Sequence, residues 1–169
     1  TPTELWTQTA YMVWANNSGG SSVAYLNITV VDELPTLSYS LTSLNLTNNT
    51  VSSDLPLVPT LTGPGEITSW VMNASLPAGL SFGTTNGTIY GTPTELWTQT
   101  AYTVWANNSG GSSAAYLNIT VVDELPALSY SLGALNLTNN TASSDLPLVP
   151  TVAGAGSITS WAINTSLPA

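Results

Sequence analysis

The stretch YTVWANNSGGSSAAYLNITVV, residues 102–122, decides the fold that we expect for this chain. In its first half Tyr102, Val104 and Ala106 alternate with residues of the opposite face. In its second half the same alternation continues through Ala115, Leu117, Ile119 and Val121. Two runs of period two, joined by the glycine-rich turn at 108–111, predict a β-hairpin with one buried face. The stretch from Tyr11 to Val31 repeats this pattern.

The rest of the unit consists of short apolar runs separated by proline, glycine and asparagine. They lie around residues 44–46, 55–58, 67–72, 80–82 and 88–90. No stretch shows the periodicity of an amphipathic helix. About seven short strands in roughly 90 residues, with frequent turns, predict an all-β fold, an antiparallel β-sandwich.

The chain repeats itself with a period of 91 residues: TPTELW at 1–6 recurs at 92–97. Residues 1–78 align without a gap to residues 92–169, and 65 of the 78 positions are identical. A period this long fits one small domain for each repeat, whereas solenoid units are shorter. The sequence therefore predicts tandem sandwiches, each one period long.

Three segments carry a resemblance to a known family: SLPAGLSF at 75–82, NGTIYGTPT at 86–94, and the hairpin from Tyr102 through the turn at 108–111. In this order they resemble the Putative Ig domain family, which is close to the cadherin-like domains of dystroglycan type. The resemblance implies an Ig-like sandwich of the kind found in tandem on large surface and secreted proteins of bacteria and archaea. The chain, free of lysine and rich in glycosylation motifs, is also similar to giant repeat proteins of marine archaea.

The motif DELP, at 32–35 and again at 123–126, is the expected junction between repeats. Residues 1–33 would then be the C-terminal part of one Ig-like repeat, 34–122 a complete repeat, and 125–169 the N-terminal part of the next. Neither end segment can bury its apolar face alone. Together the end segments lack only the counterpart of residues 79–91.

Two explanations of these end segments are open. The chain is either a stretch of a longer tandem array, or a subunit whose open end receives the tail of the next molecule by strand exchange. The near-identity of adjacent repeats favours the tandem array. Either arrangement gives a linear fibre.

The composition excludes most enzyme chemistry. The chain has nine acidic residues and no Lys, Arg, His or Cys, which gives a formal charge of −9. Catalytic triads, thiol nucleophiles and Schiff bases therefore cannot form. A chain without cations also cannot neutralise phosphates of nucleic acid or of anionic lipid, and no apolar run is long enough to insert in a membrane. We expect no enzyme and no cofactor other than the calcium and the glycans considered next.

Eleven of the 15 asparagines begin an Asn-x-Ser/Thr motif, the acceptor of N-linked glycans. Glycans would supply the hydration that the sparse charges do not, and would shield sheet edges. An alternative is that asparagine simply favours turns. The predicted glycosylation sites are Asn16, Asn27, Asn45, Asn48, Asn73, Asn86, Asn107, Asn118, Asn136, Asn139 and Asn164.

Paired carboxylates stand at both junctions, where cadherin-like arrays place calcium. The candidate calcium ligands are Asp32, Glu33, Asp123 and Glu124. Calcium needs about six to eight oxygens, so a pair cannot suffice, although Asp54 or Asp145 could join. A solvated acidic linker is the favoured interpretation.

Tryptophan divides into two expected groups. Trp70 and Trp161 lie in the motif ITSW, where an Ig-like core tryptophan is found, and are predicted to be buried. The others could contact sugars or neighbouring protein, although local packing is the favoured interpretation. These possible contact aromatics, expected to be partly exposed, are Trp6, Trp14, Trp97 and Trp105.

The sequence thus predicts a structural segment of an extracellular filament or giant cell-surface protein. Its partners would be neighbouring repeats of the same chain, or identical chains in a fibre. The alternative function is an adhesin stalk or a carbohydrate-binding module that uses exposed tryptophans, because Ig-like sandwiches serve both roles.

Overall fold

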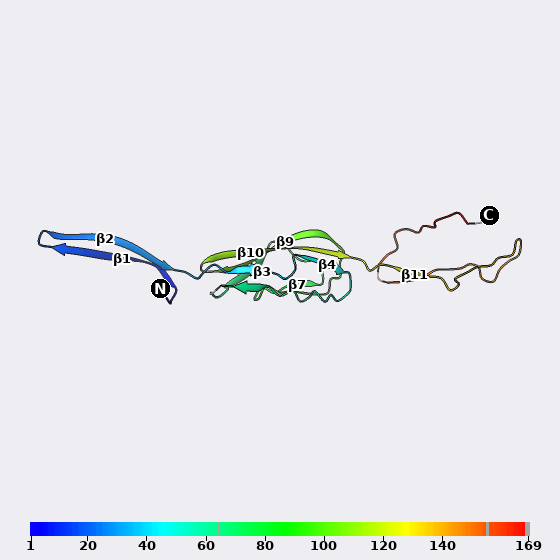
Figure 1. Cartoon of the computed structure of the whole chain (residues 1–169), viewed down its shortest axis with the longest axis horizontal. Helices are drawn as coiled ribbons and strands as arrows, with labels where there is room; N and C mark the ends of the chain where they lie inside the picture. Colours follow the sequence, from blue (N-terminus) through cyan, green and yellow to red (C-terminus); the bar gives the residue numbers. More distant parts are fainter. Residues whose placement is uncertain (64, 155, 168–169) are drawn as a thin grey trace.

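The computed structural model describes residues 1–63, 65–154 and 156–167, and in these residues every regular element is a β-strand. Three parts follow one another along the long axis of the molecule (Figure 1). They are an N-terminal hairpin, a central unit (residues 34–122), and a C-terminal segment (the described residues from 125 onward).

The main sheet of the central unit has the strand order β4-β10-β9-β6. The hairpin expected from residues 102–122 forms its centre, as the antiparallel pair β9 and β10. β6 is antiparallel to β9, whereas β4 pairs with β10 in parallel. A parallel pair needs a long crossover, and five strands lie between β4 and β10 in the chain. The bounds are β4 Ser43–Thr47, β6 Ser69–Met72, β9 Trp97–Asn108 and β10 Gly111–Val122.

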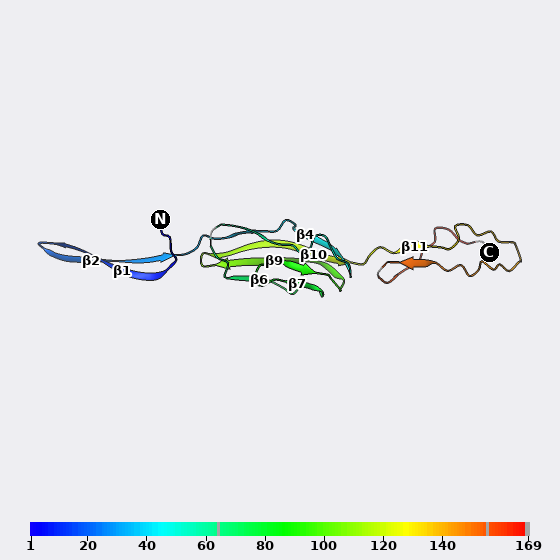
Figure 2. The same ribbon diagram turned by 90° about the horizontal axis from the view of Figure 1, so that it is seen from below.

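A second layer lies against the main sheet and consists of two short antiparallel pairs (Figures 1 and 2). Leu57, in the segment before β5, pairs with Ile89 of β8 through an isolated bridge, with N···O distances of 2.8 and 3.0 Å. Residues 55–58, expected to be a strand, form only this bridge. The pairs are β3 (Thr36–Ser38) with β5 (Thr60–Thr62), and β7 (Leu80–Phe82) with β8 (Ile89–Gly91).

The core lies between the two layers. Alternate residues of β9 and β10 are buried, as the sequence predicted, because successive side chains of a strand point to opposite faces. The predicted all-β Ig-like sandwich is therefore confirmed, with the single parallel pair as an addition. The buried hydrophobic residues are Leu37, Tyr39, Leu44, Leu46, Leu57, Trp70, Leu80, Ile89, Tyr102, Val104, Ala106, Ala115, Leu117, Ile119 and Val121.

One cluster ties the second layer to Trp70. The buried Tyr39 hydroxyl donates a hydrogen bond to the carbonyl oxygen of Gly87. Burial raises the pKa of Tyr39 to about 12. Gly87 has a φ of 70°, and a Cβ there would lie 2.3 Å from the Trp70 ring. Trp70 is only 7% exposed, so its prediction as a core residue is confirmed.

The two end parts contain strands but leave their apolar side chains uncovered. The N-terminal hairpin is formed by β1 (Trp6–Asn17) and β2 (Gly20–Val30). The C-terminal segment holds only the pair β11 (Ala127–Ser129) and β12 (Thr151–Ala153). Trp161 is 60% exposed, so its prediction as a core residue is wrong. Trp70 is covered because β6 pairs with β9, whereas within the described part of the chain no strand pairs with the residues around Trp161.

Candidate functional site

The junction before the central unit is held by the turn between β9 and β10. The Ser109 hydroxyl donates to the Asp32 carboxylate at 2.7 Å and accepts from the Asp32 amide at 2.9 Å. The Asn108 side-chain amide donates to the Glu33 carbonyl oxygen at 2.7 Å. Three hydrogen bonds therefore fix residues 32–33 to a turn more than 70 positions away in the chain.

Two glycines allow this close approach. A Cβ on Gly110 would lie 2.1 Å from the Asp32 carbonyl oxygen, which no real contact allows. A Cβ on Gly65 would lie 2.9 Å from the Cβ of Asp32, and Gly65 also has a φ of 125° that favours glycine. We call residues 32–33, 65 and 108–110 together the junction clasp.

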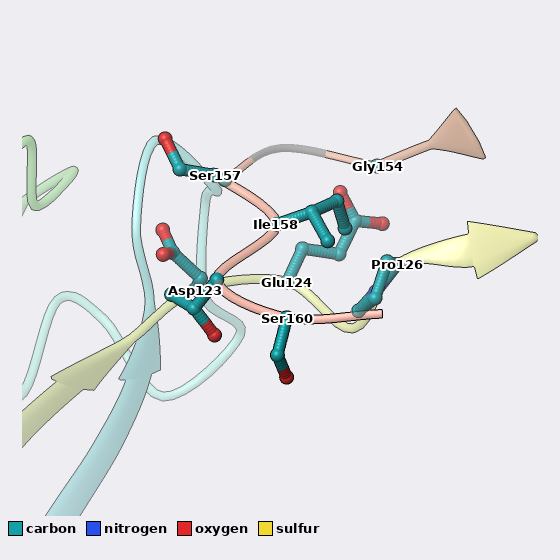
Figure 3. Close-up of a pocket in the computed structure, with 9 residues that line it drawn as sticks. Asp123, Glu124, Pro126, Gly154, Ser157, Ile158 and Ser160 are labelled. Carbon is teal, nitrogen blue, oxygen red and sulfur yellow. The ribbon is translucent and has the colours of Figure 1, made fainter. Parts of the chain in front are cut away.

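The second junction contains half of the same arrangement. A Cβ on Gly156, the counterpart of Gly65, would lie 2.9 Å from the Cβ of Asp123. A cavity of about 190 Å³ is lined by residues 123, 124, 126, 154 and 156–160 (Figure 3). In the central unit the turn at 108–110 packs against the equivalent linker residues. The described residues of the C-terminal segment hold no equivalent of this turn beside Asp123, and the cavity is partly open to solvent.

The carboxylates at the junctions do not gather into a metal-binding cluster. Nowhere in the described residues do three or more acidic, His or Cys side chains come close enough to hold a metal ion. Asp32 and Glu33 supply two carboxylates, and that of Asp32 accepts the Ser109 hydrogen bond. Asp54 and Asp145 do not join either pair: their amides bond to Ser52 and Ser143 in local turns.

The predicted glycosylation sites differ in exposure. Eight of them are exposed, among them Asn86 in the turn before β8, whose carboxamide oxygen accepts from the Thr88 amide at 3.1 Å. Asn48, Asn107 and Asn118 are half-buried. The Asn107 side-chain nitrogen, the atom that a glycan would modify, donates to Ser69 Oγ at 2.9 Å.

The four possible contact aromatics form two counterpart pairs, Trp6 with Trp97 and Trp14 with Trp105, in nearly identical sequence surroundings. Trp6 and Trp14 on the N-terminal hairpin are 46% and 57% exposed. Their counterparts Trp97 and Trp105 are half-buried on β9, and Trp97 packs against the core. Trp105 pairs with Val71 of β6, whereas β1 has β2 as its neighbour and no counterpart of β6 beside Trp14 among the described residues. The exposure of these rings therefore depends on the strands and core residues that pack around the hairpin.

The fold and its junctions define an Ig-like β-sandwich with an uncovered part at either side. The model of the Putative Ig domain family matches residues 34–122, more than half of the chain, and the chain belongs to this family. No sequence among curated proteins matches it. The described residues contain no helix long and apolar enough to cross a membrane.

Solved structures of Ig and cadherin domains are similar at low identity. The N-terminal four Ig domains of Dscam1 isoform 1.9 show 15% identity and a TM-score of 0.40, covering 67% of this chain and 27% of theirs. Protocadherin gamma B7 extracellular cadherin domains 1–4 give 15% and 0.40, with coverages of 91% and 49%. Mouse cadherin-23 EC22–24 gives 13% and 0.37, with coverages of 68% and 43%. The chain thus spans less than half of each of these structures.

Proposed function

We propose that this chain is a structural segment of an extracellular filament or giant cell-surface protein, in which Ig-like domains are strung head to tail and carry N-linked glycans. Its role is mechanical: it provides reach and spacing, and it has no catalytic activity. Its partners are neighbouring repeats, in the same chain or in identical chains.

The observation that carries this proposal is the linear succession of one sandwich and two uncovered parts of the same repeated sequence (Figure 1). The central unit buries its hairpin β9–β10, while the nearly identical hairpin β1–β2 lies beyond one end. A surface that is complementary to a different surface of the next copy produces open, linear assemblies rather than closed pairs.

The junction clasp supports a mechanical role. It ties the linker to the domain that follows, and Pro35, with its fixed φ, comes directly after. Both features restrict bending between successive domains. The absence of Lys and Arg also leaves no bond for trypsin-like proteases, which suits a segment exposed outside the cell.

Glycans fit the same function because the surface carries few charges to hydrate it. Nine acidic residues in 169 are the only charged side chains, while eight predicted sites are exposed. Sugars on the exposed sites would keep long fibres dispersed and would protect the sheet edges.

The test combines location with mass. Antibodies against the central unit, applied to intact source cells, should decorate surface fibres in electron micrographs. The chain released from these fibres should lose mass on chemical deglycosylation. Labelling confined to the cell interior would overturn the extracellular role, and an unchanged mass would overturn the glycan coat while leaving the structural role in place.

The adhesin alternative gains no specific support from the central unit, because Trp97 and Trp105 are half-buried there. A glycan-binding screen of the chain distinguishes the two functions. Specific binding of one sugar, lost on Trp105→Ala, would favour the adhesin.

A further inference from the structure

We propose that the hairpin β1–β2 of one copy of this chain docks onto the C-terminal segment of a second copy, in the register that β9–β10 has within the central unit. The inference rests on the proposed structural function and names the contact that would join the copies. The central unit itself shows the geometry of this contact, because its parts are the counterparts of the two uncovered ends.

The two ends hold most of a second core. Thirteen of the 15 buried hydrophobic residues have a counterpart 91 positions away in these ends, and all thirteen are of the same residue type. The hairpin contributes Tyr11, Val13, Ala15, Ala24, Leu26, Ile28 and Val30, and the C-terminal segment contributes Leu128, Tyr130, Leu135, Leu137, Leu148 and Trp161.

These counterparts are uncovered in the single chain. Leu26, Ile28 and Leu137 are exposed, although Leu117, Ile119 and Leu46 are buried at the equivalent positions. Several exposed apolar side chains on one face of a strand pair mark a surface that binds protein. Since each face matches one side of an existing interface residue for residue, the other face is the occupant that fits it.

The register follows from the strand pairing in the central unit. Trp70 pairs with Ala106 between β6 and β9, so Trp161 would pair with Ala15 of the other copy. Leu44 pairs with Ile119 between β4 and β10, so Leu135 would pair with Ile28 of the other copy. The hairpin would thereby insert, as an added pair of strands, between residues 134–138 and 160–163, the counterparts of β4 and β6.

The open cavity at the second junction receives the turn of the docked hairpin. In the junction clasp Ser109 binds Asp32 and Asn108 binds the Glu33 carbonyl oxygen. Ser18 and Asn17 of the hairpin are the equivalents of Ser109 and Asn108. They would make the same hydrogen bonds to Asp123 and to the Glu124 carbonyl oxygen, and Gly19 would allow the same close approach.

A second copy is the occupant because the chain cannot bring its own ends together. The central unit lies between the hairpin and the C-terminal segment along the long axis (Figure 1). Leu80 and Ile89, which belong to β7 and β8, have no counterpart 91 positions away within residues 1–169. The contact proposed here therefore concerns the main sheet of the unit, which docking would restore.

Cysteine cross-linking tests the contact in the full chain, which has no cysteine of its own. In the central unit Asn107 donates to Ser69 Oγ at 2.9 Å, and the equivalent pair across copies is Asn16 with Ser160. One chain carries Asn16→Cys and is labelled with ¹⁵N, and the other carries Ser160→Cys. On mild oxidation the mixed disulfide dimer should exceed that of Asn16→Cys with Thr151→Cys by about tenfold, because docking raises the local concentration of one pair only.

Two controls make the result decisive. The double variant Ser69→Cys with Asn107→Cys, in one chain, should form an intramolecular disulfide. It shows whether two cysteines at these paired positions can be bridged. Sedimentation of the unmodified chain should show concentration-dependent oligomers, and Ile28→Asp should reduce them to monomer while the central unit stays folded. A chain that stays monomeric, or mixed dimers no more abundant than with Thr151→Cys, would overturn the docking.

These outcomes are separate from those for the proposed function. A chain found in surface fibres that does not cross-link in this register would keep its structural role and lose the docking. A chain that cross-links but is absent from the cell surface would keep the docking and lose the proposed function.

Discussion

The hairpins β9–β10 and β1–β2 have nearly the same sequence in two different surroundings. From residue 6 to 31 and from 97 to 122 they differ only at Met12, which is Thr103, and at Val23, which is Ala114. Yet Tyr102 is 1% exposed and Tyr11 is 38% exposed. Neither sequence difference accounts for the difference in exposure, because the two hairpins have the same core-facing residues.

This difference separates what the chain determines locally from what packing determines. Both hairpins have the same register across the turn, with Asn17 opposite Gly20 and Asn108 opposite Gly111. The turn sequence and the alternation are sufficient for the pairing. Burial requires the second layer, and an isolated hairpin is marginally stable in water.

The largest effect is expected from deleting the same side chain in each hairpin. Leu117 is 2% exposed in the core, whereas Leu26 is 52% exposed. Leu117→Ala should lower the free energy of unfolding of the central unit by about 2–5 kcal/mol, because it leaves a cavity. Leu26→Ala should change it by less than about 0.5 kcal/mol. Urea unfolding followed by circular dichroism, at high dilution, measures both.

High dilution matters because docked copies would cover Leu26. The same pair measured at high concentration sharpens the comparison, since Leu26→Ala should then weaken association while Leu117→Ala lowers domain stability. Equal losses from both variants at high dilution would mean that the hairpin β1–β2 is covered within the single chain.

Glycines of the two turns provide the next comparison. A Cβ on Gly19 would lie 3.2 Å from Asn17 Oδ1, and a Cβ on Gly110 would lie 3.2 Å from Asn108 Oδ1. Only the Cβ on Gly110 would also meet the Asp32 carbonyl oxygen, at 2.1 Å. Gly110→Ala should cost about 1–3 kcal/mol by forcing the clasp apart. Gly19→Ala should be within about 0.5 kcal/mol of the original chain. Thermal unfolding of the two variants decides the matter, and equal melting temperatures would contradict the clasp.

Strands could be predicted from the sequence where core-facing and outward-facing residues alternate over a long stretch and a glycine-rich turn follows. The alternation in residues 102–122 gives the hairpin and its buried face without any tertiary knowledge. The strands β3 and β5 were missed because three residues carry no period. The parallel pair of β4 with β10 was missed because pairing between distant strands depends on the packing of the whole sandwich, for which local sequence has no signal.

The junction was predicted from the repetition of DELP, but the hydrogen bonds that residues 32–33 make were not predicted. The sequence drew attention to the carboxylates of Asp32 and Glu33 as calcium ligands, whereas in the structure the Asp32 carboxylate and the Glu33 carbonyl oxygen bind the turn at 108–110. A contact between residues so far apart has no local pattern. The pair of glycines after Ser109 is the one available signal, since adjacent glycines often permit close backbone approach. Trp161 shows the opposite limit, because its motif is that of a core residue, yet its side chain is exposed and no described strand covers it.

Alkaline pH should separate the buried tyrosine from its exposed counterpart. Burial raises the pKa of Tyr39 to about 12, from its ordinary value of 10.0, so the unfolded chain releases this proton first. The stabilising contribution is complete below pH 10 and is lost as the pH rises toward 12. In a chain without Lys, Arg or Cys, tyrosine is the only side chain that titrates there.

The measurement is the free energy of unfolding of the central unit from pH 9 to 12. Tyr39→Phe should flatten part of its decline, and burial of Tyr102, whose pKa is also raised, accounts for the remainder. Tyr130→Phe, the same substitution at the exposed counterpart outside the central unit, is the matched control. An unaltered decline in Tyr39→Phe would show that this hydroxyl is not the group that titrates.

The smallest expected effect is local and concerns the linker alone. Ser109→Ala removes both hydrogen bonds to Asp32, which are exposed and therefore contribute about 1 kcal/mol in total. The Asp32 amide should then exchange its hydrogen about fivefold faster, while amides in β10 keep their rates, because the opening is confined to the junction. Ser18→Ala, the same change in the uncovered turn, should alter neither rate in dilute solution. In docked copies Ser18→Ala should accelerate hydrogen exchange at the Asp123 amide of the neighbouring copy. An effect of Ser18→Ala that occurs only in docked copies would show that the second junction forms the same hydrogen bonds as the first.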